Sequence, residues 1–532
     1  MKLKCLSLAI GSALATLSSS SFALPLSDYN TTAYQDVYIA GSSALDPVLL
    51  RVAALQCANT GATIGTSTID EYAYSNEYVV TCTLATPVLG KTKLALHKES
   101  SNGSVNGTIA VANKQTRPFI SVALLAAQPA TTSACVLATT SVGGAHGIPL
   151  MRVQNCANQG TTGGDIANVI PDAGVSDLEP AIFDPASAAK LTDSTVPVVQ
   201  PFGVPVSVVA RDALQAAQGL TVGSDTEANM PNLSKETVTS IYTGNTTSWS
   251  TLGVTSAIWA TANAQARADG FVVPATSPAD DQIYVARRTD QTDAPGSRPN
   301  SGTQSSAEVY FTGQLCNPAN QAFLFYGPPV DSAINKTDCG TATAAPSLGP
   351  VFAGAGGGNV AACLTTHDTG GRGAVGLLGA VDQPSTFSAG TQNAYRFVKV
   401  DGYSPSLYNV ANGLYHDWVE SSYNVQPGLN ETGTPNGVVV ANLKTALTDV
   451  NALADVAANI ASSFGANVGL LANAFAVGSA GNAPTYTIPF TAATLAGAPF
   501  ANFTHETLGV PNSCQPPAQV FPANPNPGVN QG

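Results

Sequence analysis

Apolar positions along the chain fall into two patterns, short continuous runs and longer stretches with helical spacing. Runs rich in β-branched and aromatic residues predict buried strands at 36–40, 78–84, 94–96, 204–210, 282–286, 373–379 and 395–400. Apolar residues spaced three and four apart predict helices that begin near Pro47 and that cover 233–242, 304–315 and 438–464. Strands and helices alternate along most of the chain, and this order predicts an α/β fold.

The chain of 532 residues is too long for one compact core, so its length predicts two or more domains. Apolar residues make up 44% of the chain and charged residues 10%, which is enough apolar material for large cores. Two cysteine-containing stretches, 116–160 and 316–363, interrupt the alternation and are typical of insertions. The stretch 515–532 is rich in Pro and Asn and predicts an extended or mobile tail.

The first residues have the pattern of a signal peptide. Lys2 and Lys4 precede an apolar run at 6–17, and Ser21-Phe22-Ala23 fits the small-x-small rule for cleavage. The apolar run is too short to span a bilayer, which argues against a membrane anchor. We therefore expect residues 1–23 to be removed and the mature protein to be periplasmic or secreted.

The charge balance excludes some partners. The net charge of −13 becomes −15 when the leader, with Lys2 and Lys4 and no acidic residue, is removed. An acidic chain without basic runs argues against nucleic acids and anionic membranes. It does not exclude a small anion, because a buried anion site works through local donors.

Nine cysteines occur in the chain, and Cys5 lies in the predicted leader. The even number that remains, in an exported protein, predicts disulfides. None of these cysteines forms a CxxC pair or has a histidine at zinc-finger spacing, so we expect no metal site. The spacing leaves the connectivity open.

Three loops have Gly, Ser or Thr where a helix is expected to begin: 41–43, 101–104 and 301–303. A helix N-terminus offers unpaired N–H groups and partial positive charge, and glycine allows close backbone approach, which together suit anions. Each loop by itself is more typical of plain N-capping. Arg288, thirteen residues before Ser301, changes the picture because its planar fork can hold two oxygens of a tetrahedral anion. Arg287 offers the same chemistry, and the residues themselves leave the choice open.

Enzyme motifs are missing from the sequence. No GxSxG surrounds Ser42 or Ser176, and the histidines form no HExxH. The sequence thus predicts a binding protein without catalytic residues, metal or cofactor. The histidines are His97, His146, His367, His416 and His505.

Several segments, in order along the chain, resemble the phosphate-binding proteins of high-affinity phosphate ABC transporters, a family of periplasmic solute-binding proteins. The resemblance implies an α/β fold with two lobes and a ligand cleft between them, and an inorganic phosphate or similar oxyanion as ligand. It also implies a monomer that serves an ABC transporter membrane complex. The segments are IAGSSALDP at 39–47, GVSDLEP at 174–180, LSKETVTSIYTGNTTSW at 233–249, ARRTD at 286–290, NSGTQ at 300–304, GAVGLLG at 373–379 and FVKVDGYSPS at 397–406.

The resemblance implies a set of ligand residues that surround one anion with donors and a single acceptor. Asp177 would accept a hydrogen bond from a protonated phosphate oxygen, and Arg288 would pair with two other oxygens. Monohydrogen phosphate can donate that proton whereas sulfate cannot, so the carboxylate implies selectivity for phosphate. The donors would be Ser42, Ser43, the N–H groups of Ala44 and Leu45, either Ser101 or Ser104, and Ser301, Gly302 and Thr303.

The chain departs from the family pattern in two places and is longer than its members. Ala44 stands where relatives often carry a threonine hydroxyl, and about ten residues are inserted between Asp290 and Ser301. We expect the first lobe at 24–199 and 382–514, and the second at 200–381 with the insertion 316–363. An alternative is a relative with altered binding, or a structural envelope or secreted protein, that keeps the fold and uses its insertions for interaction.

Overall fold

A computed structural model describes most of the chain. The predicted signal peptide and much of the predicted tail lie outside the described residues. These are 29–58, 67–74, 76–101, 103–127, 135–137, 151–156, 165–275, 281–289, 291, 298–316, 338–345, 349–380, 382, 384, 393–426, 433–447, 471–473, 500–501, 503–505 and 512–519.

The larger sheet forms the core of the first lobe. At its centre β1 (Tyr34–Gly41) runs parallel to β4 (Lys91–Glu99) and β9 (Ala173–Ser176). Helices α1 (Asp46–Ala54) and α12 (Pro435–Ala446) pack against each other, and α12 also packs against β1. The flanking strands are β3 (Glu77–Val88), β2 (Asp70–Ala73), β7 (Arg152–Cys156) and β6 (Cys135–Leu137) on one side, and β19 (Trp418–Val425), β10 (Thr192–Gly203), β20 (Leu471–Asn473) and β21 (Phe500–Ala501) on the other.

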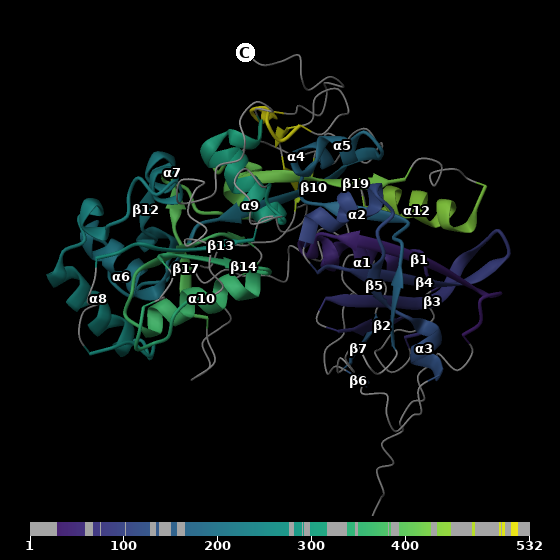
Figure 1. Cartoon of the computed structure of the whole chain (residues 1–532), viewed down its shortest axis with the longest axis horizontal. Coiled ribbons are helices and arrows are strands. Elements are labelled where there is room, and N and C mark those ends of the chain that lie inside the picture. Colours follow the sequence, from purple (N-terminus) through teal and green to yellow (C-terminus); the bar gives the residue numbers. More distant parts are fainter. Residues whose placement is uncertain are drawn as a thin grey trace, which may run out of the picture.

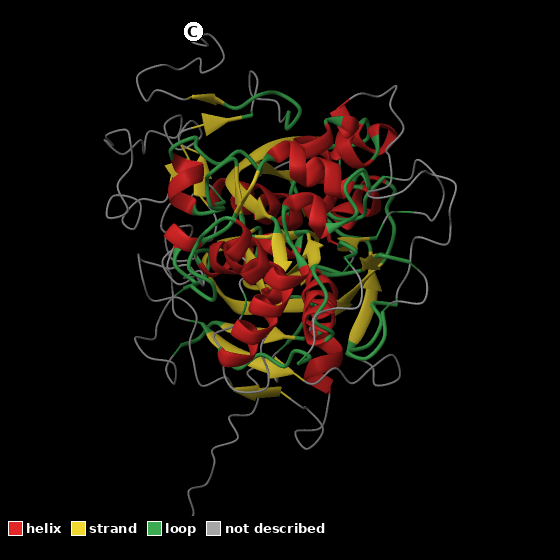
Figure 2. Cartoon of the chain, turned by 90° about the vertical axis from the view of Figure 1, so that its left-hand side faces the viewer, coloured by secondary structure: helices red, strands yellow, loops and turns green. Residues whose placement is uncertain are grey.

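The second lobe has a five-stranded sheet in the order β14-β13-β15-β11-β17. Its strands are β14 (Val351–Gly354), β13 (Tyr284–Arg288), β15 (Ala374–Gly376), β11 (Pro205–Ser207) and β17 (Tyr395–Phe397). Helices surround this sheet in Figures 1 and 2, and they bury apolar residues against it. They are α6 (Val208–Ala217), α7 (Lys235–Tyr242), α8 (Ser256–Ala268) and α10 (Gly357–Thr369).

Two antiparallel strands connect the lobes. Strand β10 ends at Gly203 and leads through Val204 into β11 of the second sheet, and β19 brings the chain back. Figure 1 shows the lobes side by side with these strands between them, so the predicted two-lobed α/β fold is confirmed. Strand β17 pairs with β11. We had expected the chain to return to the first lobe at 382. If the lobes are the domains, we propose that it returns later, between Phe397 and Trp418.

The structure has a strand at most of the positions where the sequence predicts one. The exception is a position where a helix follows a strand without a break. Residues 204–210 were predicted as one strand, but Val208 already begins α6, because buried apolar runs of this length suit either structure. Ser234 caps α7 through a hydrogen bond from the Thr237 N–H. The predicted helix 438–464 begins earlier, at Pro435, and α12 ends at Ala446. Residues 448–464 lie outside the described part.

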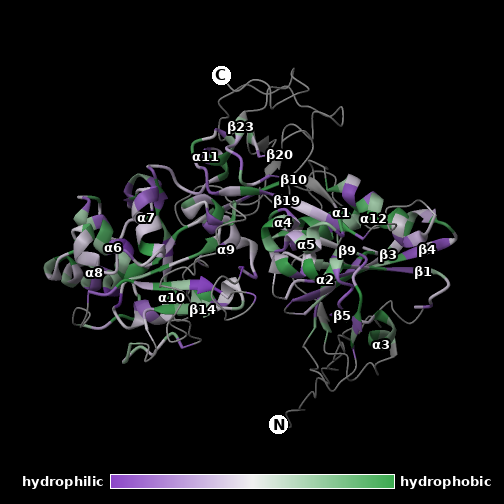
Figure 3. Cartoon of the chain, turned by 45° about the horizontal axis from the view of Figure 1, so that its top comes forward, coloured by the Kyte–Doolittle hydropathy of each residue, from purple (hydrophilic) through white to green (hydrophobic). Residues whose placement is uncertain are grey.

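Figure 3 shows hydrophobic and hydrophilic residues mixed along α10 and α12. Val360 and Leu364 of α10 and Val439 and Leu443 of α12 are buried. In the described part of the chain no helix combines the length and apolar character needed to cross a membrane. All eight cysteines expected in the mature chain form disulfides, as predicted from their even number. The pairs are Cys57–Cys82, Cys135–Cys156, Cys316–Cys514 and Cys339–Cys363.

Candidate functional site

The loop after β1 places Ser42 at the edge of the first sheet. Gly41 has a φ of +119°, and a Cβ there would lie 1.9 Å from the carbonyl oxygen of Val175, so only glycine fits at this turn. The Ser42 N–H donates to the same carbonyl at 2.9 Å. The chain is thereby fixed between β1 and β9, and the Ser42 side chain faces Asp177, which directly follows β9.

Asp177 is the centre of the candidate site. Its carboxylate accepts hydrogen bonds from the hydroxyl of Ser42 at Oδ1 and from the hydroxyl of Ser104 at Oδ2, the latter at 2.7 Å. Its own N–H donates to Ser104 Oγ at 3.2 Å. Burial raises the pKa of Asp177, while the two hydroxyls and the charges of Arg288 and Lys98 oppose the rise. The carboxyl group thus sits where a proton from a ligand would be stabilising.

The two serines of the second loop have separate roles. Ser104 lies on a 3₁₀ turn, Gly103–Gly107, and reaches Asp177. Ser101 instead donates to Glu99 and accepts from Arg117 Nη2 at 2.9 Å. Of the alternatives left open by the sequence, only Ser104 contacts Asp177.

The first loop forms a 3₁₀ turn, Ser43–Leu45, ahead of α1, and the helix proper begins at Asp46. The Ala44 N–H donates to Ser42 Oγ at 3.2 Å, so this predicted donor is engaged inside its own turn. Ser43 is exposed, whereas Leu45 is buried.

Arg288 lies at the end of β13 and is buried. Its Nη2 donates to the carbonyl of Ala355 at 2.6 Å and lies 3.9 Å from where a Cβ of Gly103 would be. Its Nε is buried and has no hydrogen-bond partner among the described residues. Burial lowers the pKa of Arg288, and the charges of Asp382 and Asp177 oppose the change.

Arg287 is the neighbouring candidate, and its side chain lies on the opposite face of β13, because successive strand residues alternate. Its Nη1 donates to the carbonyl of Arg288 at 2.9 Å. Of the two arginines, the geometry therefore places Arg288 near Gly103 and Asp177.

The third loop begins α9 (Gly302–Ala307) directly beside Asp177. Ser301 caps this helix, because its hydroxyl accepts from the Gln304 N–H at 3.1 Å. A Cβ at Gly302 would lie 1.9 Å from Asp177 Oδ2, so the two residues are in direct contact, while Thr303 is partly exposed. The predicted helix 304–315 is divided: α9 continues as a π-helical turn, Glu308–Thr312, and a 3₁₀ turn, Gln314–Cys316.

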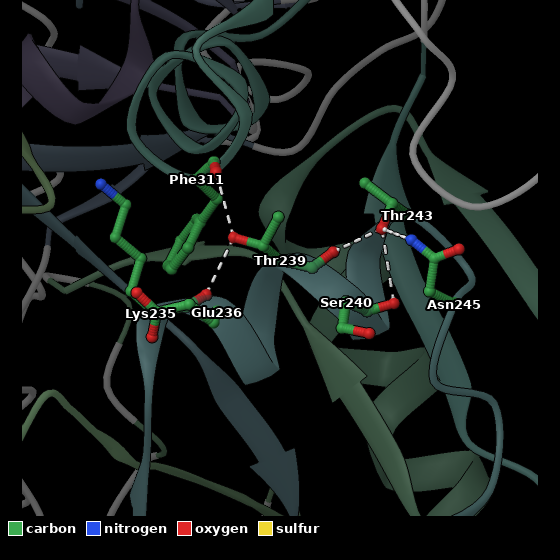
Figure 4. A pocket seen from close by; sticks show the side chains of 7 residues that line it. All are labelled: Lys235, Glu236, Thr239, Ser240, Thr243, Asn245 and Phe311. Carbon is green, nitrogen blue, oxygen red and sulfur yellow. Dashed lines mark hydrogen bonds between the residues drawn. The ribbon is translucent and has the colours of Figure 1, made fainter.

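The loop 301–303 touches the loop after β9 at the contact between Gly302 and Asp177. Among the described residues, a pocket of about 430 Å³ lies on α7 and is drawn in Figure 4. Its hydroxyls bond mainly to nearby backbone: Thr239 Oγ1 donates to the carbonyls of Lys235 and Phe311 at 2.8 and 3.0 Å. None of the predicted site residues lines this pocket.

A buried ion pair behind the first loop was missed in the sequence. Lys98 is fully buried, and its Nζ lies 2.9 Å from Asp46 Oδ1 and donates to the carbonyl of Gly41 at 3.0 Å. Its charge lies close enough to oppose the rise in the pKa of Asp177. The only sequence signal was a lysine at the end of an apolar strand, which is typical of a surface residue.

One group of potential metal ligands occurs among the described residues, formed by Cys339, Cys363 and His367. The two cysteines form a disulfide, and the guanidinium of Arg372 donates from Nε to His367 Nδ1 at 3.1 Å. A disulfide and a neighbouring cation both oppose metal binding. This group therefore gives no support for a metal site. The candidate site around Asp177 consists of hydrogen-bond donors that surround one carboxyl group.

Comparisons with known proteins give similarity of fold at a distance. No family model matches the chain, and no curated protein matches it. A putative phosphate ABC transporter substrate-binding protein with bound phosphate from Clostridium perfringens is 12% identical, covers 80% of this chain and 97% of its own, and has a TM-score of 0.35.

Two other solved structures show the same degree of similarity. PstS from Borrelia burgdorferi is 10% identical over 79% of this chain and 96% of its own, with a TM-score of 0.31. An ABC-type phosphate transport receptor from Vibrio cholerae is 14% identical over 52% of this chain and 74% of its own, with a TM-score of 0.28. At these values the ligand has to be argued from the residues of this chain.

Proposed function

We propose that this protein is an extracytoplasmic solute-binding protein that captures a tetrahedral oxyanion, inorganic phosphate, between its two lobes. The observation that carries the proposal is the surrounding of Asp177: a buried carboxyl group beside a buried arginine whose Nε lacks a partner among the described residues. An anion that brings both acceptor oxygens and one proton would complement the two groups. Monohydrogen phosphate has this composition.

In the proposed complex the three loops contribute donors from both lobes. The first lobe would supply Ser42, Ser43 and the N–H group of Leu45, and Ser104 would supply a second hydroxyl. The Ala44 N–H is left out, because Ser42 Oγ engages it. Arg288 and the loop 301–303 would close the site from the second lobe. Ser101 is left out, because Glu99 and Arg117 engage it.

Binding would need an opening motion, because Gly302 contacts Asp177 directly. Strands β10 and β19 join the lobes and would act as the hinge. Opening would separate Gly302 from Asp177 and admit the anion, and closing would remove its water. As a monomeric periplasmic or secreted protein, it would deliver the anion to an ABC transporter.

The same contact favours a second candidate function. Gly302 packs on Asp177, and both carboxylate oxygens are hydrogen-bonded by serines of the chain itself. A structural envelope or secreted protein that keeps the fold and interacts through its insertions would have this property.

Calorimetric titration separates the two functions. Purified protein, unfolded and refolded to remove bound anion, would be titrated with phosphate, arsenate and sulfate at pH 7. The proposal expects saturable binding of phosphate and arsenate and much weaker binding of sulfate. Absence of heat with all three anions would contradict it and favour the structural protein.

A further inference from the structure

Two segments near the C-terminus form a small unit that we call the strap, defined as residues 503–505 and 512–519. Strand β22 (Phe503–Thr504) pairs antiparallel with β23 (Ala518–Gln519), so the first residues of the predicted tail are part of the fold. Figure 3 shows β23 of this unit beside α11 (Leu407–Ala411), and Figure 1 draws the unit in yellow near the crossing strands.

The strap is anchored to the return crossing. The buried carboxylate of Glu420 on β19 accepts from Thr504 Oγ1 at 2.7 Å and from the His505 N–H at 2.6 Å. The His505 ring lies 4.2 Å from the ring of Trp418, and its Nδ1 lies 2.6 Å from the carbonyl oxygen of Gln515. These contacts hold the strap on β19.

From this anchor the strap reaches the loop that carries Asp177. The N–H and the hydroxyl of Ser513 donate to the two carboxylate oxygens of Glu179, at 2.9 and 2.7 Å. Both residues are buried, and Glu179 lies two residues after Asp177. Hydrogen bonds to a buried carboxylate are among the stronger ones in proteins.

The next residue of the strap is joined covalently to the other half of the candidate site. Cys514 forms a disulfide with Cys316, the last residue of the helical segment that begins at Gly302. Leu315, beside that disulfide, packs with Leu178 and Ile182 in one buried apolar cluster. The segment 302–316 is thus fastened to the loop 177–179 at both ends, directly at Gly302 and through the strap at Cys316.

Two fastenings between the same two segments resist rotation that one would permit. We infer that the strap holds the lobes closed and slows exchange of the anion, because opening must break the bonds between Ser513 and Glu179 or bend the strap. The inference rests on the proposed function for the identity of the anion. The effect of the strap on lobe opening does not depend on which anion binds.

The test compares removal of two disulfides. Cys316→Ser with Cys514→Ser releases the strap, whereas Cys135→Ser with Cys156→Ser removes a disulfide between β6 and β7 at the far edge of the first sheet. Small-angle X-ray scattering of the phosphate-free proteins measures opening. We expect a larger radius of gyration for the strap variant alone.

Release of phosphate gives the second readout. We expect the dissociation rate of bound phosphate to rise about tenfold in the strap variant, equivalent to ~1.4 kcal/mol, and to stay unchanged in the control. Ser513→Ala and Glu179→Gln keep the disulfide and should shift both readouts in the same direction by a smaller factor. These two variants decide the case if the cysteine variant does not fold.

The outcomes separate the inference from the proposed function. Scattering curves of the strap variants that match the wild type overturn the inference, whatever the ligand is. Opening of the strap variants without any phosphate binding by the wild type supports the strap and rejects phosphate as the ligand. Equal opening in the variant that lacks the disulfide between Cys135 and Cys156 would show a general loss of rigidity, and it would also overturn the inference.

Discussion

Gly302 packs directly on the carboxylate of Asp177, where a Cβ would lie 1.9 Å from Oδ2 and 2.4 Å from Cγ. Separations this short are outside the range of real contacts, so the closed arrangement requires glycine at 302. The contact joins the loop after β9 in the first lobe to the start of α9. Because the contact is so close, adding one methyl group at residue 302 is enough to test whether the lobes close here.

Gly302→Ala should therefore keep the lobes apart. The methyl group cannot be accommodated without moving α9 from Asp177, and we expect phosphate affinity to fall by about tenfold or more, equivalent to ~1.4 kcal/mol. Calorimetry and small-angle scattering measure the two effects. Gly358→Ala in α10 is the control, because a Cβ there meets nothing within 4 Å. Wild-type affinity in Gly302→Ala would show that closure does not depend on this contact.

Arg288→Ala should remove the charge-assisted contact to the anion. Such contacts at buried sites are worth on the order of 2–5 kcal/mol, and Arg288→Lys should recover only part of the loss because it lacks the planar fork. Arg287→Ala, measured on protein whose folding is verified by circular dichroism, should leave the affinity unchanged. The reverse order of effects would mean that the assignment of the two arginines is off by one residue.

Ser104→Ala and Ser101→Ala test the division of labour in the second loop. Ser104→Ala leaves Asp177 Oδ2 without its hydroxyl donor, and we expect a loss of phosphate affinity of about 1 kcal/mol. Ser101→Ala disturbs only the cluster with Glu99 and Arg117, so its affinity should match the wild type. Equal losses in the two titrations would contradict the assignment.

The sequence predicted the features that depend on local pattern. Apolar runs predicted β1, β3, β4 and β13, and apolar residues at helical spacing predicted α7 at 233–242. The even number of cysteines predicted disulfides, because parity does not depend on the fold. The connectivity could not be predicted, because Cys316–Cys514 spans a sequence separation of 198 that only tertiary structure brings together.

The candidate site was predicted in its residue types and missed in its packing. The three Gly- and Ser-containing loops were recognisable, but no local pattern distinguishes Ser104 from Ser101 or Arg288 from Arg287. The choice between the arginines depends on which face of β13 is turned toward the first lobe. Lys98 was missed because its partner Asp46 lies on a different element, which only the tertiary structure brings close.

Buried carboxyl groups should make stability depend on pH. Burial raises the pKa of Asp368 to about 8, so the folded protein holds a proton that the unfolded chain releases at about pH 4. The free energy of unfolding should therefore fall as pH rises from about 4 to about 8. Asp417 and Glu71, each with a pKa raised to about 7, act in the same direction.

Asp368→Asn isolates one of these groups. Asp368 Oδ1 accepts from the Val209 N–H at 2.7 Å, and an asparagine can accept the same bond. Arg211, Arg396 and Asp212 remain nearby. Urea denaturation at pH 5, 6, 7 and 8 should give a shallower pH dependence for the variant, by on the order of a few kcal/mol across the range. Parallel curves would mean that Asp368 stays ionised in the folded protein.

Asp177→Asn tests selectivity, which is the property that the proposed function depends on most. A buried carboxylate beside an anion is stabilised only if a proton lies between them, which monohydrogen phosphate supplies and sulfate does not. Asparagine can both donate and accept, so the preference for phosphate over sulfate should shrink by roughly 1–3 kcal/mol. Competition titrations with both anions measure the ratio. Asp184→Asn is the control, because Asp184 caps α5 (Pro185–Ala188) and asparagine caps equally well. An unchanged ratio in Asp177→Asn would leave Asp177 a structural residue that fixes Ser42 and Ser104, and the anion would then have to bind elsewhere.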